Sequence, residues 1–308
     1  FKLAEELGFE KGRAESLWLL GIANMGVDPN GSLAFFQNAL DIAERNKYKQ
    51  GEGKYTNAIG TVFGVTGRDS LAIVYYRKAI EIAKELNDPH ELGKYFINIS
   101  QAHNRMGKVE KALEGYNEAL RVLLKAGDKN GAAICYNSMG NIYTTQGNYP
   151  IALECLHNGL KIREEMRETS AVSKSLVSIG SIYFTQKNYE KALEYNQKVI
   201  EIAGNAGDKH TLAGGLLNIG LIYMQTNNEQ AMEYLQKALV ISKDLKILPL
   251  QINILLNTGL FYYKHSEKQK ALEFYQEALS LSEENGMKSS ESLAKLQIAI
   301  IYYDQKEF

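Results

Sequence analysis

Small and apolar residues recur along the 308-residue chain with a period close to 40. In each period a small residue, glycine in all but one case, stands among apolar and aromatic positions, and successive members lie 39 or 40 residues apart. These residues are Gly21, Gly60, Ser100, Gly140, Gly180, Gly220 and Gly259. A second small residue keeps the same period at Ser32, Ala72, Ala112, Ala152, Ala192, Ala231 and Ala271. A fixed period of this length predicts a stack of one repeated supersecondary unit.

Residues 129–168 show what the repeated unit is. Asp128 stands directly before a run with helical apolar spacing, where its carboxylate can accept the first free amide hydrogens of a helix. Residues 146–149 read Gln-Gly-Asn-Tyr and predict a turn, and Pro150 suits the first turn of a second helix. Each unit is therefore a pair of antiparallel helices. The chain is predicted to be an all-α, right-handed superhelical solenoid of about seven and a half helical hairpins.

The period divides residues 1–308 into repeats of a single solenoid domain. The predicted units are residues 9–48, 49–88, 89–128, 129–168, 169–208, 209–247 and 248–287, with a partial unit at 288–308. Phe1–Gly8 resembles the end of a second helix, and Gln305–Phe308 aligns with the turn at Gln146–Tyr149. Because both ends fall inside a repeat, we expect the sequence to be a fragment of a longer protein.

The recurrent small residues have a packing reason. Gly140 and Ala152 lie where the two helices of a hairpin must approach closely, and a larger side chain would separate them. A glycine inside a helix costs about 1 kcal/mol relative to alanine. Its repetition therefore predicts close helix contacts at these positions.

The quoted residues resemble a known family. The fourth repeat is similar to the tetratricopeptide repeat in its longer form of about 40 residues. The residues that carry the similarity are Gly140-x-x-Tyr143, then Gly147-Asn-Tyr149, Ala152 and Gly159. Similar long repeats occur in scaffolds built on Leu-Gly-Asn-type repeats and in bacterial regulators, including peptide receptors and Rap-type phosphatases. The resemblance implies that a peptide or protein segment binds in a concave groove lined by the first helix of each unit.

Several functions are compatible with this resemblance. We expect a non-enzymatic binding module, the sensory or scaffolding part of a larger bacterial signalling regulator. Alternatives are a peptide-responsive switch that controls an attached kinase, cyclase or DNA-binding domain, and a phosphatase-like Rap-type regulator. The last would need an N-terminal helical bundle, for which the residues before Gly21 leave no room. Self-association through the apolar faces of incomplete end repeats is a further alternative.

The groove positions are those three before, one after and four after the recurrent small residue of each first helix. They share one helical face because they are spaced four and three residues apart. In the middle repeats they and neighbouring cations form a polar surface of Asn57, Thr61, Lys94, Gln101, Asn104, Arg105, Asn137, Asn141 and Thr144. Towards the C-terminus they become apolar, with Leu217, Leu221, Met224, Leu256, Leu260 and Tyr263. Between these stretches lie Val177, Ser181 and Phe184.

Each stretch has two interpretations. Asparagine and glutamine carry donors and acceptors, so they can hold a peptide backbone, and the apolar stretch can take hydrophobic anchors. Alternatively, the leucines pack against the neighbouring first helix and the amides are solvated surface. Asn137 and Asn141 stand where chaperone-binding relatives of this family carry a lysine and an asparagine. Without the lysine we expect no clamp for a terminal carboxylate.

Charge and composition narrow the class of partner. The chain has 35 basic and 36 acidic residues and no basic run, which argues against direct nucleic-acid binding. It has no apolar run of membrane-spanning length. Two cysteines, Cys135 and Cys155, argue against a disulfide scaffold, and their register predicts two buried thiols. We expect a cytoplasmic protein, or a periplasmic one if a signal peptide has been removed.

The remaining polar patterns predict no catalytic residue, cofactor or metal. Glutamates recur once per unit on the second helix, as in Glu194 and Glu233, where each faces a lysine four residues later. The five histidines have no spacing suited to a metal. We therefore expect a protein or peptide segment as the partner.

Overall fold

The computed structural model describes residues 8–306, and within them the chain forms fifteen helices and no strand. The predicted all-α solenoid of helical hairpins is confirmed. The chain divides into two compact units, residues 1–162 and 163–308, with the division near the end of one helix. Each unit is described by itself.

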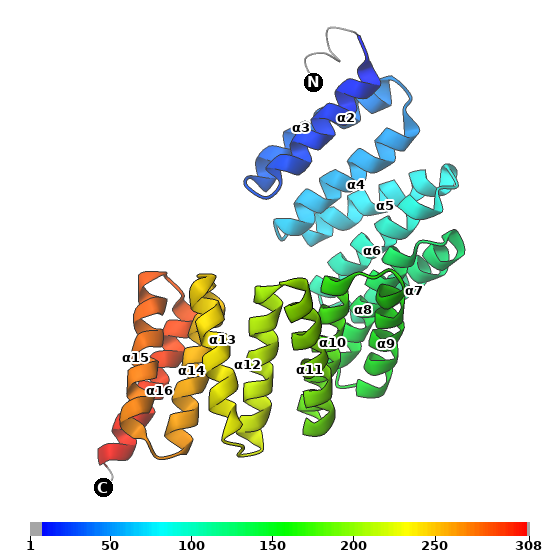
Figure 1. Cartoon of the computed structure of the whole chain (residues 1–308). Helices are drawn as coiled ribbons and strands as arrows, with labels where there is room; N and C mark the ends of the chain where they lie inside the picture. The colour runs from blue at the N-terminus through cyan, green and yellow to red at the C-terminus, as the bar shows by residue number, and fades with distance from the viewer. Residues whose placement is uncertain (1–7, 307–308) are drawn as a thin grey trace. The chain divides into compact units, whose positions relative to one another are not determined.

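Unit 1 consists of successive antiparallel helices (Figure 1). They are α2 (Glu10–Asn24), α3 (Pro29–Arg45), α4 (Lys49–Val65), α5 (Asp69–Glu85), α6 (Pro89–Arg105), α7 (Val109–Ala126), α8 (Lys129–Thr145) and α9 (Tyr149–Glu165), which ends beyond the division. Each of the seven full-length predicted intervals contains one helix pair and the partial interval 288–308 contains one helix, although the exact unit boundaries stay a prediction.

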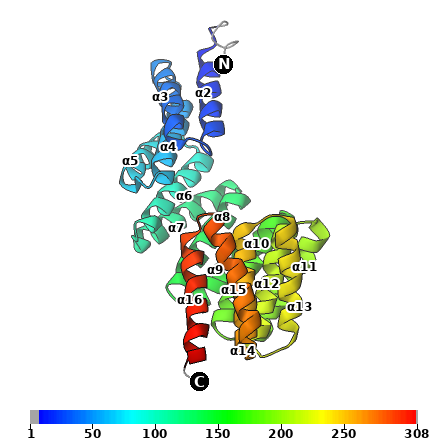
Figure 2. The same ribbon diagram turned by 90° about the vertical axis from the view of Figure 1, so that its left-hand side faces the viewer.

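Unit 2 continues in the same way, and its last helices lie side by side in Figure 2. They are α10 (Thr169–Thr185), α11 (Tyr189–Ala206), α12 (Lys209–Gln225), α13 (Gln230–Asp244), α14 (Leu248–Lys264), α15 (Lys268–Glu284) and α16 (Lys288–Lys306). The turn expected from Gln305 is wrong, because α16 continues through Gln305 and Lys306. Residues 1–7, 307 and 308 lie outside the described residues.

Helix starts follow the sequence signals. The side chains of Asp28, Asp88, Asp128 and Asp208 each accept a hydrogen bond from the backbone N–H three residues later, at 2.8–3.1 Å. These are N-caps, which satisfy one of the free amides of a helix start. Pro29 and Pro89 follow two of them as first helical residues. The predicted capping by Asp128 is confirmed.

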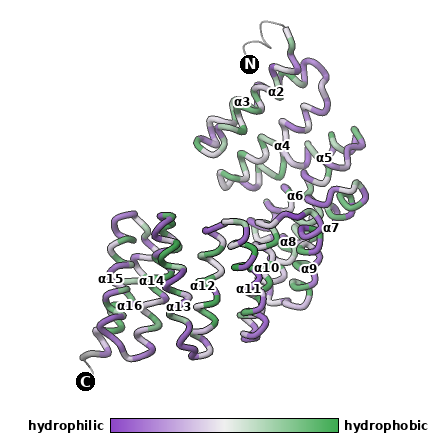
Figure 3. The backbone as a smooth tube through the Cα atoms, in the orientation of Figure 1, coloured by the Kyte–Doolittle hydropathy of each residue, from purple (hydrophilic) through white to green (hydrophobic). Residues whose placement is uncertain are grey.

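The first helices form the inner layer of each unit. In unit 1, α2 contacts α4, α4 contacts α6, and α6 contacts α8, whereas α3, α5 and α7 do not contact one another. The same first-helix contacts join α10, α12, α14 and α16 in unit 2. Apolar and polar stretches alternate along each helix (Figure 3), as expected for helices buried on one side. The groove positions therefore belong to the more closely packed layer.

The recurrent glycines lie at close helix contacts. A Cβ on Gly220 would be 2.9 Å from Leu235 Cδ2 and 3.4 Å from the carbonyl oxygen of Ala231. Ser100 replaces the glycine in the third repeat, and the second helix compensates with Gly115. A Cβ on Gly115 would lie only 2.2 Å from Ser100 Oγ. The small residue has moved to the partner helix, so the close approach is kept.

Two glycines on α12 provide a test of this packing. We expect Gly220→Ala to lower the free energy of unfolding by about 1–2 kcal/mol, because overpacking costs more than the gain in helix propensity. Gly214→Ala, where a Cβ would meet nothing within 4 Å, should instead stabilise unit 2 by up to about 1 kcal/mol. Denaturant unfolding monitored by circular dichroism measures both. Equal stabilisation by the two alanines would contradict the packing argument.

Candidate protein-binding groove

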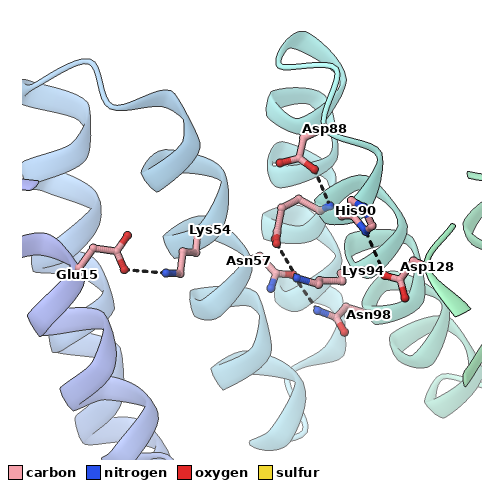
Figure 4. A network of polar contacts seen from close by, with 9 residues as sticks. Glu15, Lys54, Asn57, Asp88, His90, Lys94, Asn98 and Asp128 are labelled. Atoms are coloured by element: carbon pink, nitrogen blue, oxygen red, sulfur yellow. Dashed lines mark hydrogen bonds and ion pairs between the residues drawn. The ribbon is translucent and has the colours of Figure 1, made fainter. Parts of the chain in front are cut away.

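At the N-terminal end of the inner layer, Glu15 of α2 joins Tyr48, which precedes α4, and two side chains of α4. Its carboxylate accepts hydrogen bonds from Lys54 Nζ at 2.7 Å, from the Tyr55 hydroxyl at 3.1 Å and from the Tyr48 hydroxyl at 3.3 Å. The ammonium of Lys54 also lies 3.5 Å from the ring centre of Trp18. Figure 4 shows the Glu15–Lys54 contact bridging two helices. The cluster ties the first two repeats together.

The surroundings of Glu15 shift several pKa values. Burial acts to raise the pKa of Glu15, but the hydrogen bond and charge of Lys54, with the two phenol groups, lower it overall. The pKa values of Tyr55 and Tyr48 are raised, first by burial and then by the Glu15 carboxylate. Both phenols therefore stay neutral and act as donors.

The predicted amide of α4 is engaged within the protein. Asn98 Nδ2 of α6 donates a hydrogen bond to Asn57 Oδ1 at 2.9 Å, as drawn in Figure 4. The Thr61 hydroxyl donates to the backbone carbonyl of Asn57 at 3.1 Å. The side chains of Asn57 and Thr61 are half-buried. Asn57 and Asn98 thus form a polar bridge between first helices, which still leaves a donor or acceptor on each amide.

The basic residues of the polar stretch are paired with acids. Lys94 Nζ is 2.7 Å from Glu91, one turn earlier on α6, and Arg105 donates to Asp69 of α5 at 2.6 and 2.9 Å. His90 lies 3.3 Å from Asp128, the N-cap residue of α8. These contacts reduce the positive charge that the sequence predicts for this surface. Exposed ion pairs of this kind contribute little stability each.

The other predicted polar residues differ in exposure. Gln101, Asn104 and Asn141 are exposed, and Asn137 is half-buried. The Thr144 hydroxyl donates to the carbonyl of Gly140 at 2.8 Å, which occupies its hydrogen. Three neutral amides are therefore accessible on the inner layer between α6 and α8.

The predicted apolar positions lie in the packing between helices. Leu217 and Met224 are buried, and Leu221 and Leu260 pack against the same cluster. Leu256 and Tyr263 contact the core around α15, and the Tyr263 hydroxyl bonds to the carboxylate of Asp304. Most of their surface is therefore used for helix packing, as the second interpretation expects. Their role in binding stays a prediction.

Unit 2 contains a pocket of about 270 Å³ on the groove side of α10, α11 and α12. It is lined by Val177, Gly180, Ser181, Phe184, Asn196, Asn218, Leu221 and Ile222. Val177, Ser181, Phe184 and Leu221 are groove positions of the sequence, whereas Asn196 and Asn218 were missed. The repeat register could have indicated Asn196, because it stands where every other complete repeat has a large residue.

The predictions for cysteines, metal sites, membrane-spanning helices and surface ion pairs concern further features of the described residues. Cys135 and Cys155 are free and buried, as predicted, and burial raises the pKa of both thiols, that of Cys135 to about 12. Within residues 8–306 no three His, Cys, Asp or Glu side chains gather to hold a metal ion. In the same range, helices long and apolar enough to span a membrane are not found. Lys198 pairs with Glu194 at 2.7 Å, the predicted surface pair.

Paired antiparallel helices, a recurrent glycine contact and an inner layer of first helices define a tetratricopeptide-type repeat protein, and a tetratricopeptide repeat model matches residues 171–244. The family model described as soluble NSF attachment protein, SNAP, matches residues 30–205, more than half of the chain. The chain belongs to this family. A model for anaphase-promoting complex subunit 5 matches residues 221–303. No curated protein matches the sequence.

Solved structures share the fold at low sequence identity. A signal transduction ATPase with numerous domains and a tetratricopeptide repeat sensor, from Pyrococcus horikoshii, matches 91% of this chain and 44% of its own, with 16% identity and a TM-score of 0.69. Aspartyl phosphate phosphatase F from Bacillus subtilis matches over 91% and 73%, with 14% identity and a TM-score of 0.67. A Rap protein complexed with competence and sporulation factor matches over 99% of both chains, with 12% identity and a TM-score of 0.57.

Proposed function

We propose that this protein is a non-enzymatic binding module that holds a peptide or protein segment along its first helices. The observation that carries the proposal is the neutral polar surface of α6 and α8. Lys94 and Arg105 are paired with acids, while the amides of Gln101, Asn104 and Asn141 are exposed. Neutral amides can pair with the N–H and carbonyl groups of a peptide backbone without requiring charge on the ligand.

The similar proteins support a macromolecular partner. The SNAP family is described by attachment to another protein, and one similar structure is a Rap protein complexed with competence and sporulation factor. Another carries its tetratricopeptide repeats as a sensor. We therefore propose a sensory or scaffolding role within a larger bacterial signalling regulator. The similarity to an aspartyl phosphate phosphatase, at 14% identity, supports the fold and assigns no catalytic residue to this chain.

The groove is tested by removing three amides from its polar stretch. We expect a displayed library of random peptides to yield binders, and Asn57→Ala, Asn137→Ala, Asn141→Ala in one protein to weaken them at least about tenfold. That loss corresponds to about 1.4 kcal/mol, the scale of one or two hydrogen bonds. Fluorescence polarisation with the selected peptides measures the affinity.

The control carries the same chemistry on the second helices. Asn38, Asn117 and Asn158 are exposed there, and their combined replacement by alanine should leave peptide affinity unchanged. Thermal unfolding must be similar for both triple variants. Peptide binding that survives loss of Asn57, Asn137 and Asn141 would contradict a site at these three amides.

A further inference from the structure

The fifth repeat departs from the others at the centre of its hairpin. The residue four positions after the recurrent small residue of the second helix is large and buried in six repeats. These residues are Phe36, Tyr76, Tyr116, Leu156, Leu235 and Tyr275. In the fifth repeat the position is Asn196, which is also buried, with 2% of its surface exposed. A buried amide costs free energy unless its groups are bonded, so this substitution needs a reason.

The smaller side chain leaves a volume that the other hairpins fill. In the fourth and sixth repeats, leucine side chains lie against the first-helix glycine, within 2.7–2.9 Å of where a Cβ would be. In the fifth, only the Asn196 amide approaches Gly180 in this way, with Nδ2 at 2.8 Å. The pocket of about 270 Å³ lies at this place and is lined by both residues.

The inner end of the pocket is polar and held in position. Asn196 Nδ2 donates to the carbonyl of Ala192 at 2.8 Å, and its Oδ1 accepts from Asn218 Nδ2 of α12 at 3.0 Å. An asparagine amide has two N–H groups and two lone pairs. These two bonds therefore leave one donor and one acceptor position of Asn196 for a bound group.

The rest of the lining is apolar. Val177 and Phe184 of α10 and Leu221 and Ile222 of α12 surround the space, with Ser181 as a further polar group. The lining contains no charged residue, so a charged group would lose its hydration without compensation. A cavity of about 150 Å³ takes a benzene ring, and the available volume therefore accepts a single substituted ring.

We propose that this pocket binds a phenol ring, presented as the tyrosine side chain of a segment lying in the groove. The ring packs among Val177, Phe184 and Leu221, and its hydroxyl bonds to the amides of Asn196 and Asn218. Because the pocket opens among groove positions, this inference rests on the proposed function and specifies one side chain of the ligand. A phenylalanine would leave the buried amide positions unpaired, which disfavours it.

The pocket is tested with side-chain analogues and the whole chain, without any peptide. We expect p-cresol, the analogue of tyrosine, to bind saturably and at least tenfold more tightly than toluene, the analogue of phenylalanine. Binding should shift the side-chain amide signals of Asn196 and Asn218 in nitrogen–proton NMR spectra. Absence of saturable binding, or equal affinity for toluene, would overturn the proposal.

Variants distinguish pocket binding from other effects. Asn196→Leu, which restores the residue type of Leu156 and Leu235, should abolish p-cresol binding and keep or raise the thermal midpoint. Asn196→Ala leaves the space open and should keep toluene binding while removing the preference for p-cresol. Gln197→Leu, at the exposed neighbouring position on α11, is the matched control and should bind p-cresol normally. Retention of p-cresol binding by Asn196→Leu would contradict the assignment.

A further experiment with peptides distinguishes binding of a free phenol from binding of a tyrosine side chain in a peptide. Groove-binding peptides are compared with versions in which each tyrosine is replaced by phenylalanine, and we expect at least a tenfold loss at one position. If p-cresol binds but no peptide depends on tyrosine, the pocket takes small phenols and the peptide assignment is wrong. If peptides bind through the polar stretch without using the pocket, the proposed function stands and this inference fails alone.

Discussion

Leu123→Ala should lower the free energy of unfolding of unit 1 by about 2–5 kcal/mol, the range for a fully buried leucine. Leu123 of α7 is 0% exposed and lies between two glycines of neighbouring helices. A Cβ on Gly93 of α6 would be 2.4 Å from its side chain, and one on Gly131 of α8 would be 2.8 Å away. The side chain therefore joins the third repeat to the fourth, and its loss opens a cavity between them.

The adjacent residue supplies the control. Leu124 is on the same helix but 51% exposed, so Leu124→Ala should change stability by no more than about 0.5 kcal/mol. Denaturant unfolding, with hydrogen exchange of α6 to α8, measures the size and the place of the effect. Neighbouring repeats in a solenoid are coupled mainly to each other, so exchange should increase first around α7. Equal effects of the two substitutions would contradict the conclusion that the buried side chain of Leu123 joins the third repeat to the fourth.

Glu15→Ala is expected to cost unit 1 about 1–3 kcal/mol at neutral pH, because it removes the acceptor of three donors. Of these, the hydroxyl of Tyr55 belongs to a residue that is 0% exposed, so loss of its partner cannot be fully compensated by water. Lys54 also loses its partner at 2.7 Å. Denaturant unfolding at pH 7 measures the change, and Glu44→Ala, at an exposed position on α3, is the control.

The same contacts predict a pH dependence. The pKa of Glu15 in the folded chain is below its ordinary value of 4.5, because Lys54 and the two phenols outweigh burial. Its contribution is therefore fully present above about pH 4.5 and is lost as the pH falls through the folded-state pKa. The difference in free energy of unfolding between wild type and Glu15→Gln should therefore shrink as the pH is lowered below about 4.5. A difference that is constant from pH 7 to pH 3 would contradict a charged role for Glu15.

Much of the fold could be predicted because the signals are local and repeated. The helical hairpins were predicted from the glycine spacing near 40, from aspartates before helices and from prolines in first turns. The structure agrees, because helices start directly after Asp88, Asp128 and Asp208. The candidate surface was less predictable. Periodicity places Lys94 and Arg105 on it, but their partners Glu91 and Asp69 decide how much charge remains.

The sequence by itself determined the repeat, the hairpin and the helical face that could bind, because these depend on spacing within about 40 residues. Tertiary structure decided which side chains are available, since that depends on contacts between repeats. The hydrogen bond from Asn98 to Asn57 is one such contact, and the sequence pattern does not show it. The position of Leu123 between Gly93 and Gly131 is another. In the fifth repeat, likewise, the pattern shows an exception at Asn196, but only packing shows the resulting pocket.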